Sequence, residues 1–211
     1  MTYKYAGAGA DATGAVATSI IENVLGLPVQ PSLIGDIHGV IEGAPTKKEL
    51  KDIDNSPAYS VIPGVGHSRL TQRLQKEYTD AGANEYEARA RTTGTILNRR
   101  LTPLILGIAG ALAGGMYGTH IYNEQKKRGI PNHNDFDWNN GSPIHPPFRY
   151  AVIGGMAGTA AGSLINMICG VAGALSDKKS KKDTKDDMYS YHKLLIPGYG
   201  AYEYSNQIFG D

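Results

Sequence analysis

Two groups of residues in this sequence have types and spacings that suggest chemistry. The first is the run GAGADATG at 7–14, which resembles a phosphate-binding loop in its glycines alone. It lacks a preceding strand and the lysine of a P-loop, so it does not indicate nucleotide binding. The second is Asp135, Asp137 and Asn139, which imitate the start of an EF-hand loop, but Asn140 stands where that loop needs glycine. Neither group predicts a bound cofactor or a calcium switch.

Histidine and cysteine give no stronger candidate. The six histidines are scattered and form no HExxH or HxxxH pair. Cys169 is the one cysteine, which excludes an internal disulfide and a multi-cysteine zinc site. No set of serine, histidine and acid follows from spacing. We therefore expect no catalytic residue, no cofactor and no metal ligand, and we predict that the protein is not an enzyme.

The charges of the 211-residue chain are nearly balanced but unevenly placed. Lysine and arginine total 21 against 20 acids, for a formal net charge of +1. This balance argues against general nucleic-acid binding, so we expect no specific nucleic-acid partner. Two stretches, 101–123 and 150–176, carry no formal charge. A membrane-spanning helix needs about 20 mostly apolar residues, so both stretches are long enough to span.

Both charge-free stretches place small residues four apart, on one face of a helix. In lipid, such a strip of bare backbone lets two helices approach closely. In water, each glycine would cost a helix about 0.5–1 kcal/mol. We therefore predict a mainly α-helical protein with a two-helix glycine-zipper transmembrane hairpin; the alternative is that these helices pack inside a protein assembly without touching lipid. The predicted helix-packing residues are Gly107, Gly110, Gly114, Gly118, Gly154, Gly158, Gly162 and Gly170.

A second pattern is a possible internal repeat with an offset of 134 residues. KKELKD at 47–52 matches KKDTKD at 181–186, and IPGVG at 62–66 matches IPGYG at 196–200. The proline fixes φ at the first corner of a turn, and the next glycine supplies the positive φ of a type II turn. The second glycine permits another turn or the start of a helix. We interpret each motif as a docking elbow beside a membrane or as a stiff connector; the elbow residues are Ile62, Pro63, Gly64, Gly66, Ile196, Pro197, Gly198 and Gly200.

These patterns divide the chain into six segments. The first is an N-terminal arm with a short amphipathic helix at 15–27, and the last ends in a tyrosine-rich tail. The segments are the arm (1–46), the first repeat with a charged helix (47–100), the first membrane-type helix (101–123), a polar connecting loop (124–149), the second membrane-type helix (150–176), and the second repeat with the tail (177–211).

A small protein with glycine-laddered spans, flanked by lysine-rich and IPGxG segments, resembles the minor membrane-associated virion proteins of large DNA viruses or phages. The residues that carry the resemblance are Ile62–Gly66, Ile196–Gly200 and the ladder Gly154, Gly158 and Gly162. The resemblance implies a structural role, which is either to link an internal membrane to the capsid shell or to line a genome-delivery conduit. It carries over no catalytic residue.

We therefore expect a non-enzymatic structural membrane protein, a minor virion component that anchors or bridges a membrane and a protein shell. Its partners would be a lipid bilayer and other virion or membrane-complex proteins, in a homo- or hetero-oligomer. Its location would be the internal membrane of the virion or a host membrane. Two alternatives remain open, an oligomeric pore-forming or genome-ejection protein and an accessory subunit of a large membrane complex.

Overall fold

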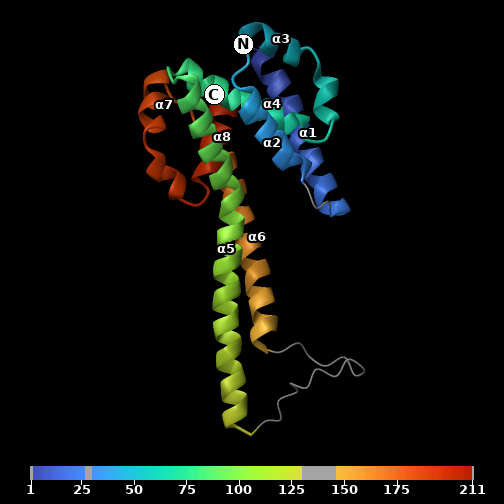
Figure 1. Ribbon diagram of the computed structural model, residues 1–211, viewed down its shortest axis with the longest axis vertical. Helices are drawn as coiled ribbons and strands as arrows, with labels where there is room; N and C mark the ends of the chain where they lie inside the picture. The colour runs from blue at the N-terminus through green and yellow to red at the C-terminus, as the bar shows by residue number, and fades with distance from the viewer. Residues whose placement is uncertain (1, 27–29, 130–145, 211) are drawn as a thin grey trace. The chain divides into compact units, whose positions relative to one another are not determined.

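The computed structural model describes residues 2–26, 30–129 and 146–210 (Figure 1). Over these residues the protein is mainly helical (84%), with eight α-helices and no strand, which confirms the predicted mainly α-helical character. The elements are α1 (Thr2–Leu25), α2 (Pro31–Glu42), α3 (Lys47–Asp54), η1 (Pro57–Val61), α4 (Val65–Asp80), α5 (Glu85–Lys127), α6 (Pro146–Ala174), α7 (Lys181–Met188), η2 (Tyr191–Leu195) and α8 (Tyr199–Phe209), where η denotes a 3₁₀-helix.

The chain divides into two compact units. Unit 1 comprises Met1–Asn98 and Cys169–Asp211, and unit 2 comprises Arg99–Ile168. Two helices are shared, because α5 leaves unit 1 after Asn98 and α6 returns to it at Cys169. Unit 2 is therefore a long insertion in the sequence between the two segments of unit 1.

In unit 1, α4 packs against α1, α2 and α8. Leu70, Leu74 and Tyr78 recur every four residues along α4, and each is at most 3% exposed. This spacing places one stripe of large side chains on a single face of the helix. Ala8 of α1 and Ile208 of α8 pack against the stripe and complete a small apolar core.

The N-terminal helix differs from the expected short helix at 15–27. α1 begins at Thr2 and ends at Leu25, so it also contains the glycine-rich run 7–14. Glycine lowers helix propensity, but tertiary packing overrides that preference here. A Cβ at Gly14 would fall on the carbonyl oxygen of Ser60, so only glycine permits the close contact between α1 and η1.

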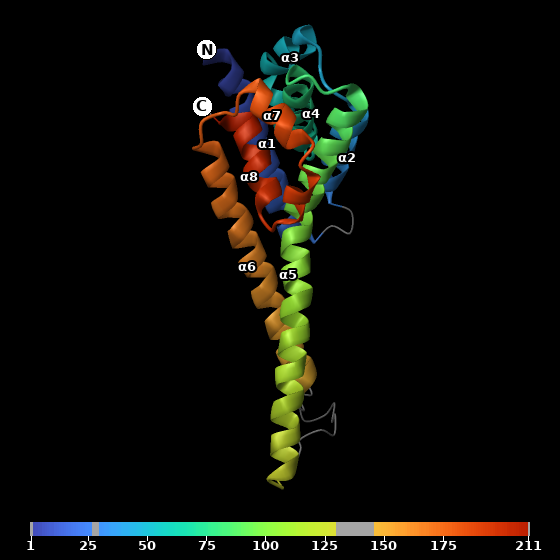
Figure 2. The same cartoon turned by 90° about the vertical axis from the view of Figure 1, so that its left-hand side faces the viewer.

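Unit 2 is a hairpin of two antiparallel helices, the second part of α5 and the first part of α6, which lie side by side in both ribbon views (Figures 1 and 2). α5 continues past the expected end at 123 to Lys127, and α6 begins at Pro146 rather than at 150. Proline is tolerated in the first turn of a helix because the N–H it lacks would have no partner there. Most of the expected connecting loop, with Asp135, Asp137 and Asn139, lies outside the described residues.

Candidate membrane hairpin and paired ionic clusters

The two helices of unit 2 approach each other through glycine. A Cβ at Gly110 would fall on the carbonyl oxygen of Gly154, and a Cβ at Gly158 on that of Leu106. The backbones therefore pack directly, with no room for side chains between them. Seven of the predicted packing residues would place a Cβ against the other helix at less than 3 Å: Gly107, Gly110, Gly114, Gly118, Gly154, Gly158 and Gly162.

The eighth predicted packing residue, Gly170, lies in unit 1, where a Cβ would be 3.3 Å from the Ser205 hydroxyl oxygen. The ladder position between Gly162 and Gly170 is Asn166. Its side-chain nitrogen donates a hydrogen bond to the carbonyl oxygen of Arg99 across the hairpin. The amide nitrogen in the ladder is therefore satisfied inside the helix pair, as is required of a polar group in an apolar setting.

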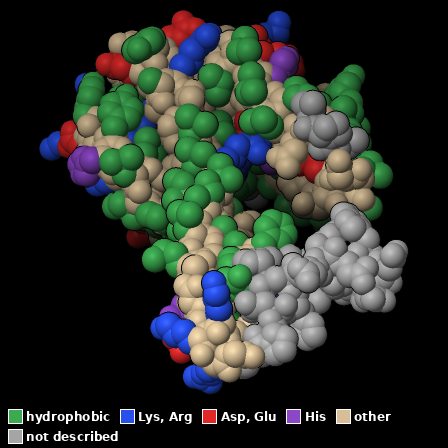
Figure 3. Space-filling view, turned by 60° about the horizontal axis from the view of Figure 1, so that its bottom comes forward, with side chains coloured by type: hydrophobic (Ala, Val, Ile, Leu, Met, Phe, Trp, Pro, Cys, Tyr) green, Lys and Arg blue, Asp and Glu red, His purple; other side chains and the backbone are tan. Residues whose placement is uncertain are grey.

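The outward surface of the hairpin carries large apolar side chains. Met116 is 76% exposed, Met156 70% and Leu112 65%. In the space-filling view, green hydrophobic side chains cover the hairpin, and blue basic side chains gather at its far end (Figure 3). Both helices contain a stretch long and apolar enough to cross a membrane, as predicted. The other exposed apolar residues are Leu101, Leu104, Ile105, Ile108, Tyr117, Phe148, Val152, Ile153, Leu164, Met167 and Ile168.

The two IPGxG motifs, which were predicted to be docking elbows or stiff connectors, form the same turn. Gly64 has φ 85° and Gly198 has φ 82°, which are left-handed conformations that favour glycine. The N–H after each glycine donates to the isoleucine carbonyl three residues earlier, at 3.0 Å to Ile62 and 3.1 Å to Ile196. This is the predicted type II geometry. Ile62 and Ile196 are 45% and 56% exposed, so both elbows present an aliphatic side chain outward.

The equivalence of the two segments extends well beyond the turns. Thr46 and Ser180, 134 positions apart, both cap a helix by accepting a hydrogen bond from the backbone N–H three residues later. The helices α3 and α7, the 3₁₀-helices η1 and η2, and the starts of α4 and α8 then follow at the same offset. The repeat is therefore a repeat of structure as well as of sequence.

α1 and the first part of α5 are also equivalent to each other. The sequence comparison at the offset of 134 did not find them, because they are 80 residues apart. Ala-Asp-Ala-Thr-Gly at 10–14 of α1 corresponds to Ala-Arg-Thr-Thr-Gly at 90–94 of α5, at an offset of 80. A Cβ at Gly66 would lie 2.7 Å from the Ala15 nitrogen, and one at Gly200 would touch the carbonyl oxygen of Thr95, the counterpart of Ala15. Each elbow helix thus begins against the backbone of its partner helix, near Ala15 in one copy and near Thr95 in the other.

These matches define two copies of one helical arrangement within unit 1. The first copy consists of α1 to α4, and the second of residues 85–98 of α5, the end of α6, α7, η2 and α8. The end of α6 matches α2, because Gly39 packs on the carbonyl oxygen of Ser68 and Gly173 on that of Tyr202, all at the offset of 134. Residues 19–34 of the first copy therefore correspond to 99–168 of the second, which is unit 2.

Each copy buries an ion pair between its first and last helix, with opposite polarity. In the first copy, Asp11 of α1 lies 3.2 Å from Arg69 of α4. In the second copy, Arg91 of α5 lies 3.6 Å from Glu203 of α8. Asp11 and Arg91 are equivalent positions, and so are Arg69 and Glu203. Acid and base have therefore changed places between the copies.

Neighbouring groups fix the polarity of each pair. In the first copy Arg73 also binds Asp11, at 3.4 Å, and it binds Asp54 as well. In the second copy Lys179 approaches Glu203 to 3.1 Å and also binds Asp187. The equivalent of Arg73 in the second copy is an uncharged glutamine, at position 207. In each copy, the buried acid, Asp11 or Glu203, thus lies close to two basic side chains.

The cluster around Glu203 perturbs its titratable neighbours. The hydroxyl of Tyr78, fully buried, donates to Glu203 at 3.2 Å, and burial together with that carboxylate raises the pKa of Tyr78 well above its usual value. Burial and the same carboxylate raise the pKa of Tyr199 to about 12. Burial opposes ionisation of Asp187, but hydrogen bonds from Lys179 and Lys193 lower its pKa. Both tyrosines are therefore neutral, and Asp187 is ionised, at neutral pH.

The tyrosine-rich tail contributes to unit 1 rather than standing free of it. Tyr204 is 4% exposed and belongs to the apolar core. Tyr199 and Tyr202 are half-buried, and the Lys179 ammonium lies within 6 Å of both rings. Tyr189 and Tyr191 remain exposed, at 57% and 44%. Part of the tyrosine-rich tail is therefore interior structure.

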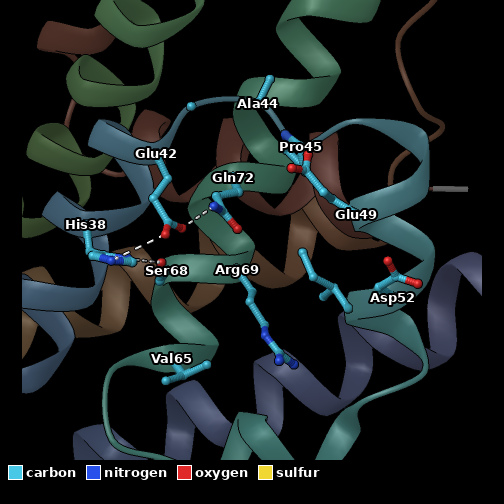
Figure 4. Close-up of a pocket in the computed structure, with 12 residues that line it drawn as sticks. His38, Glu42, Ala44, Pro45, Glu49, Asp52, Val65, Ser68, Arg69 and Gln72 are labelled. Carbon is cyan, nitrogen blue, oxygen red and sulfur yellow. Dashed lines mark hydrogen bonds and ion pairs between the residues drawn. The ribbon is translucent and has the colours of Figure 1, made fainter.

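A cavity of about 550 Å³ lies between α2, α3 and α4 (Figure 4). His38, at its edge, hydrogen-bonds Ser68 at 3.0 Å and lies 3.4 Å from Glu42, which accepts a hydrogen bond from Gln72. Arg69 points away from these groups and binds Asp11. Among the described residues, His, Cys, Asp and Glu form no group of three that could hold a metal ion. His38, Glu42, Ser68 and Gln72 thus form one chain of polar contacts beside the cavity.

No family model matches the chain, and neither the curated proteins nor the solved structures contain a match to it.

Proposed function

We propose that this protein is a non-enzymatic structural membrane protein in which the hairpin anchors unit 1 to a bilayer. The observation that carries the proposal is the hairpin surface, where apolar side chains face outward along two helices with glycine between them. From Leu101 to Tyr122 the helix rises about 30 Å, which matches the hydrocarbon thickness of a bilayer. Removing this surface from water is strongly favourable.

The packing of the glycines within one hairpin favours an anchor over an oligomeric pore. In a pore built from several hairpins, the small-residue faces would pack between different copies of the chain. Here, Gly110 of α5 and Gly154 of α6 already pack against each other within one hairpin. Large side chains such as Met116 and Met156 face outward, where lipid would meet them.

The role of unit 1 in this proposal is to bind protein at the membrane surface. Val61 and Ile62 before one elbow, and Leu195 and Ile196 before the other, are exposed by 45–84%. Two equivalent aliphatic pairs support docking to a protein shell through both copies. The virion setting rests on the resemblance carried by the elbows and the Gly154 ladder. The bilayer is the internal membrane of the virion or a host membrane.

Alkaline carbonate extraction tests the anchor. We expect the full chain to stay in the membrane pellet and liposomes that contain it to retain trapped dye. Release of the protein into the supernatant without aggregation would overturn the anchor in favour of a protein assembly without lipid, and dye release would favour the pore.

A pair of leucine substitutions tests the hairpin itself. Gly158→Leu places a side chain on the carbonyl oxygen of Leu106 and should separate the helices. Met156→Leu puts the same residue type at a position that is 70% exposed, and it should behave like the wild type. Cross-linking of cysteines placed on the two helices would measure their approach. Equal cross-linking in both variants would contradict the proposed packing.

A further inference from the structure

The tip formed by the end of α1 and by α2 has its two acidic side chains inside, whereas many of its large apolar side chains lie outside. On α1, Thr18 and Glu22 are buried, whereas Ile20 is 59% and Val24 77% exposed. A helix on the surface of a soluble protein has the opposite arrangement. The exposed apolar side chains of the tip, which we define as residues 16–25 and 31–41, are Val16, Ile20, Ile21, Val24, Leu25, Leu33, Ile34, Ile37 and Ile41.

The outward surface of most of the tip carries no charge. Between positions 12 and 37 the sequence contains two ionisable side chains, Glu22 and Asp36, and both are buried. Glu22 accepts hydrogen bonds from the backbone N–H and the hydroxyl of Ser32. Asp36 accepts one from Thr71 at 3.1 Å. Protein-binding surfaces have a polar rim around an apolar centre, and an uncharged apolar surface is better matched by lipid.

The tip is also the structural counterpart of the hairpin. Thr18 of α1 and Asn98 of α5 are equivalent at the offset of 80, and each accepts a hydrogen bond from an elbow N–H. The donor is the first glycine of its elbow for Thr18 (Gly64, 3.2 Å) and the second glycine for Asn98 (Gly200, 2.6 Å). In both ribbon views, α1 and the first part of α5 run away from the end of unit 1 where α3 lies (Figures 1 and 2).

We propose that the tip is a second membrane contact, which enters one leaflet of the bilayer without crossing it. From Val16 to Leu25, α1 rises about 14 Å, roughly half of the hydrocarbon thickness. The buried Glu22 and Asp36 hold α1, α2 and α4 together from inside, so the tip enters lipid with its polar groups satisfied. The inference rests on the proposed membrane setting, and it assigns to lipid a surface that is separate from the hairpin.

Site-directed spin labelling of the full chain in phospholipid vesicles tests the inference. With Cys169→Ser as background, single labels are placed at Val24→Cys in the tip, at Leu112→Cys in the hairpin and at Lys48→Cys in the exposed part of α3. We expect the Val24 label, like the Leu112 label, to be more accessible to oxygen than to a water-soluble nickel chelate. The Lys48 label should show the reverse.

The outcomes separate the tip from the hairpin. A Val24 label open to the nickel chelate, in vesicles where the Leu112 label is in lipid, would overturn the tip proposal and leave the anchor intact. A Val24 label in lipid while the Leu112 label is in water would support the tip and overturn the anchor. A Val24 label closed to both reagents would mean that protein covers the tip, and this too would overturn the proposal.

Discussion

The two copies within unit 1 hold the same helices together with opposite charges. In the first copy an acid on α1 binds an arginine on α4, and in the second an arginine on α5 binds an acid on α8. The equivalent glycines, Gly66 and Gly200, both lie against the backbone of the first helix of their copy. The arrangement thus requires a buried pair of opposite charges but not a particular charge at either position. A second base, Arg73 or Lys179, decides which polarity each copy has.

The copies also differ in the segment that comes after their first helix. The first copy makes a short apolar tip over 19–34, whereas the second inserts 99–168 as a hairpin. In each copy, the residue just before this segment, Thr18 or Asn98, accepts a hydrogen bond from the N–H of an elbow glycine. The difference teaches that one end of this arrangement accepts segments of very different length, because the ionic pairs and elbow glycines that hold the copy together lie elsewhere.

The largest expected effect comes from removing one member of a buried pair. Glu203→Leu or Asp11→Leu should each lower the free energy of unfolding of unit 1 by about 3–5 kcal/mol, because the remaining base stays buried without its partner. Circular dichroism during urea unfolding in detergent micelles measures the loss. Glu85→Ala breaks an exposed pair with Arg89 and is the control, with a loss below about 1 kcal/mol. Equal losses in all three variants would contradict the buried pairs.

A charge exchange sharpens the same comparison. Asp11→Arg with Arg69→Glu gives the first copy the polarity of the second, but Arg73 would then face a new arginine. The double variant should therefore stay destabilised, and adding Arg73→Gln should recover part of the stability, because the second copy has glutamine at the equivalent position. If urea unfolding finds the triple variant no more stable than the double variant, Arg73 does not decide the polarity.

A smaller effect is expected at the glycines that begin the elbow helices. Gly66→Ala and Gly200→Ala should each cost about 1–3 kcal/mol of unfolding free energy, because a Cβ at either position meets the backbone of the partner helix. Gly9→Ala is the control, since a Cβ there has no atom within 4 Å, and it should stabilise the helix by about 0.5–1 kcal/mol. A large difference between the first two variants would show that the copies are not equivalent.

Removing a helix-capping side chain should lower the free energy of unfolding by about 1 kcal/mol. Thr46→Ala and Ser180→Ala each remove the side chain that accepts the backbone N–H of α3 or α7. The first copy has a reciprocal bond, in which Glu49 accepts from the Thr46 backbone N–H at 2.7 Å. In the second, Asp183 instead accepts from the Ser180 hydroxyl, at 2.6 Å. Glu49→Ala should therefore weaken its copy more than Asp183→Ala, as measured by thermal unfolding.

The smallest expected effect distinguishes the copies by pH. The pKa of Tyr199 is about 12 in the folded protein, against about 10 in an unfolded chain. Its contribution to stability is therefore complete below pH 10 and is lost as the pH rises from about 10 to 12. Tyr199→Phe should reduce the alkaline loss of stability, whereas Tyr86→Phe, at an 82% exposed position, should not change it. Identical alkaline curves for wild type and Tyr199→Phe would contradict the assignment.

Local rules predicted the parts of the fold that local chemistry determines. Proline followed by glycine is sufficient for the turn at Ile62–Val65 and at Ile196–Tyr199, and both turns have the predicted hydrogen bond. Long runs without charge predicted two helices that could span a membrane. The offset of 134 predicted a repeat, and the helices follow it.

Contacts between distant residues could not be predicted in this way. Asp11 and Arg91 carry opposite charges, so a comparison by residue type does not match them, although the Thr-Gly shared by both segments is a usable signal. The orientation of α1 was also missed, since its apolar residues face outward. Periodicity finds the two faces of a helix but does not determine which face is buried.

The sequence by itself determined the helical character of the chain, the elbow turns and the two apolar spans, because each depends on residues close together along the chain. The tertiary structure alone decided that Arg91 meets Glu203, that Gly170 packs in unit 1 and that Glu22 and Asp36 lie inside the tip. A buried charge is stable only where a partner from another helix is in place. That partner is fixed by how the two copies pack, which no short stretch of sequence encodes.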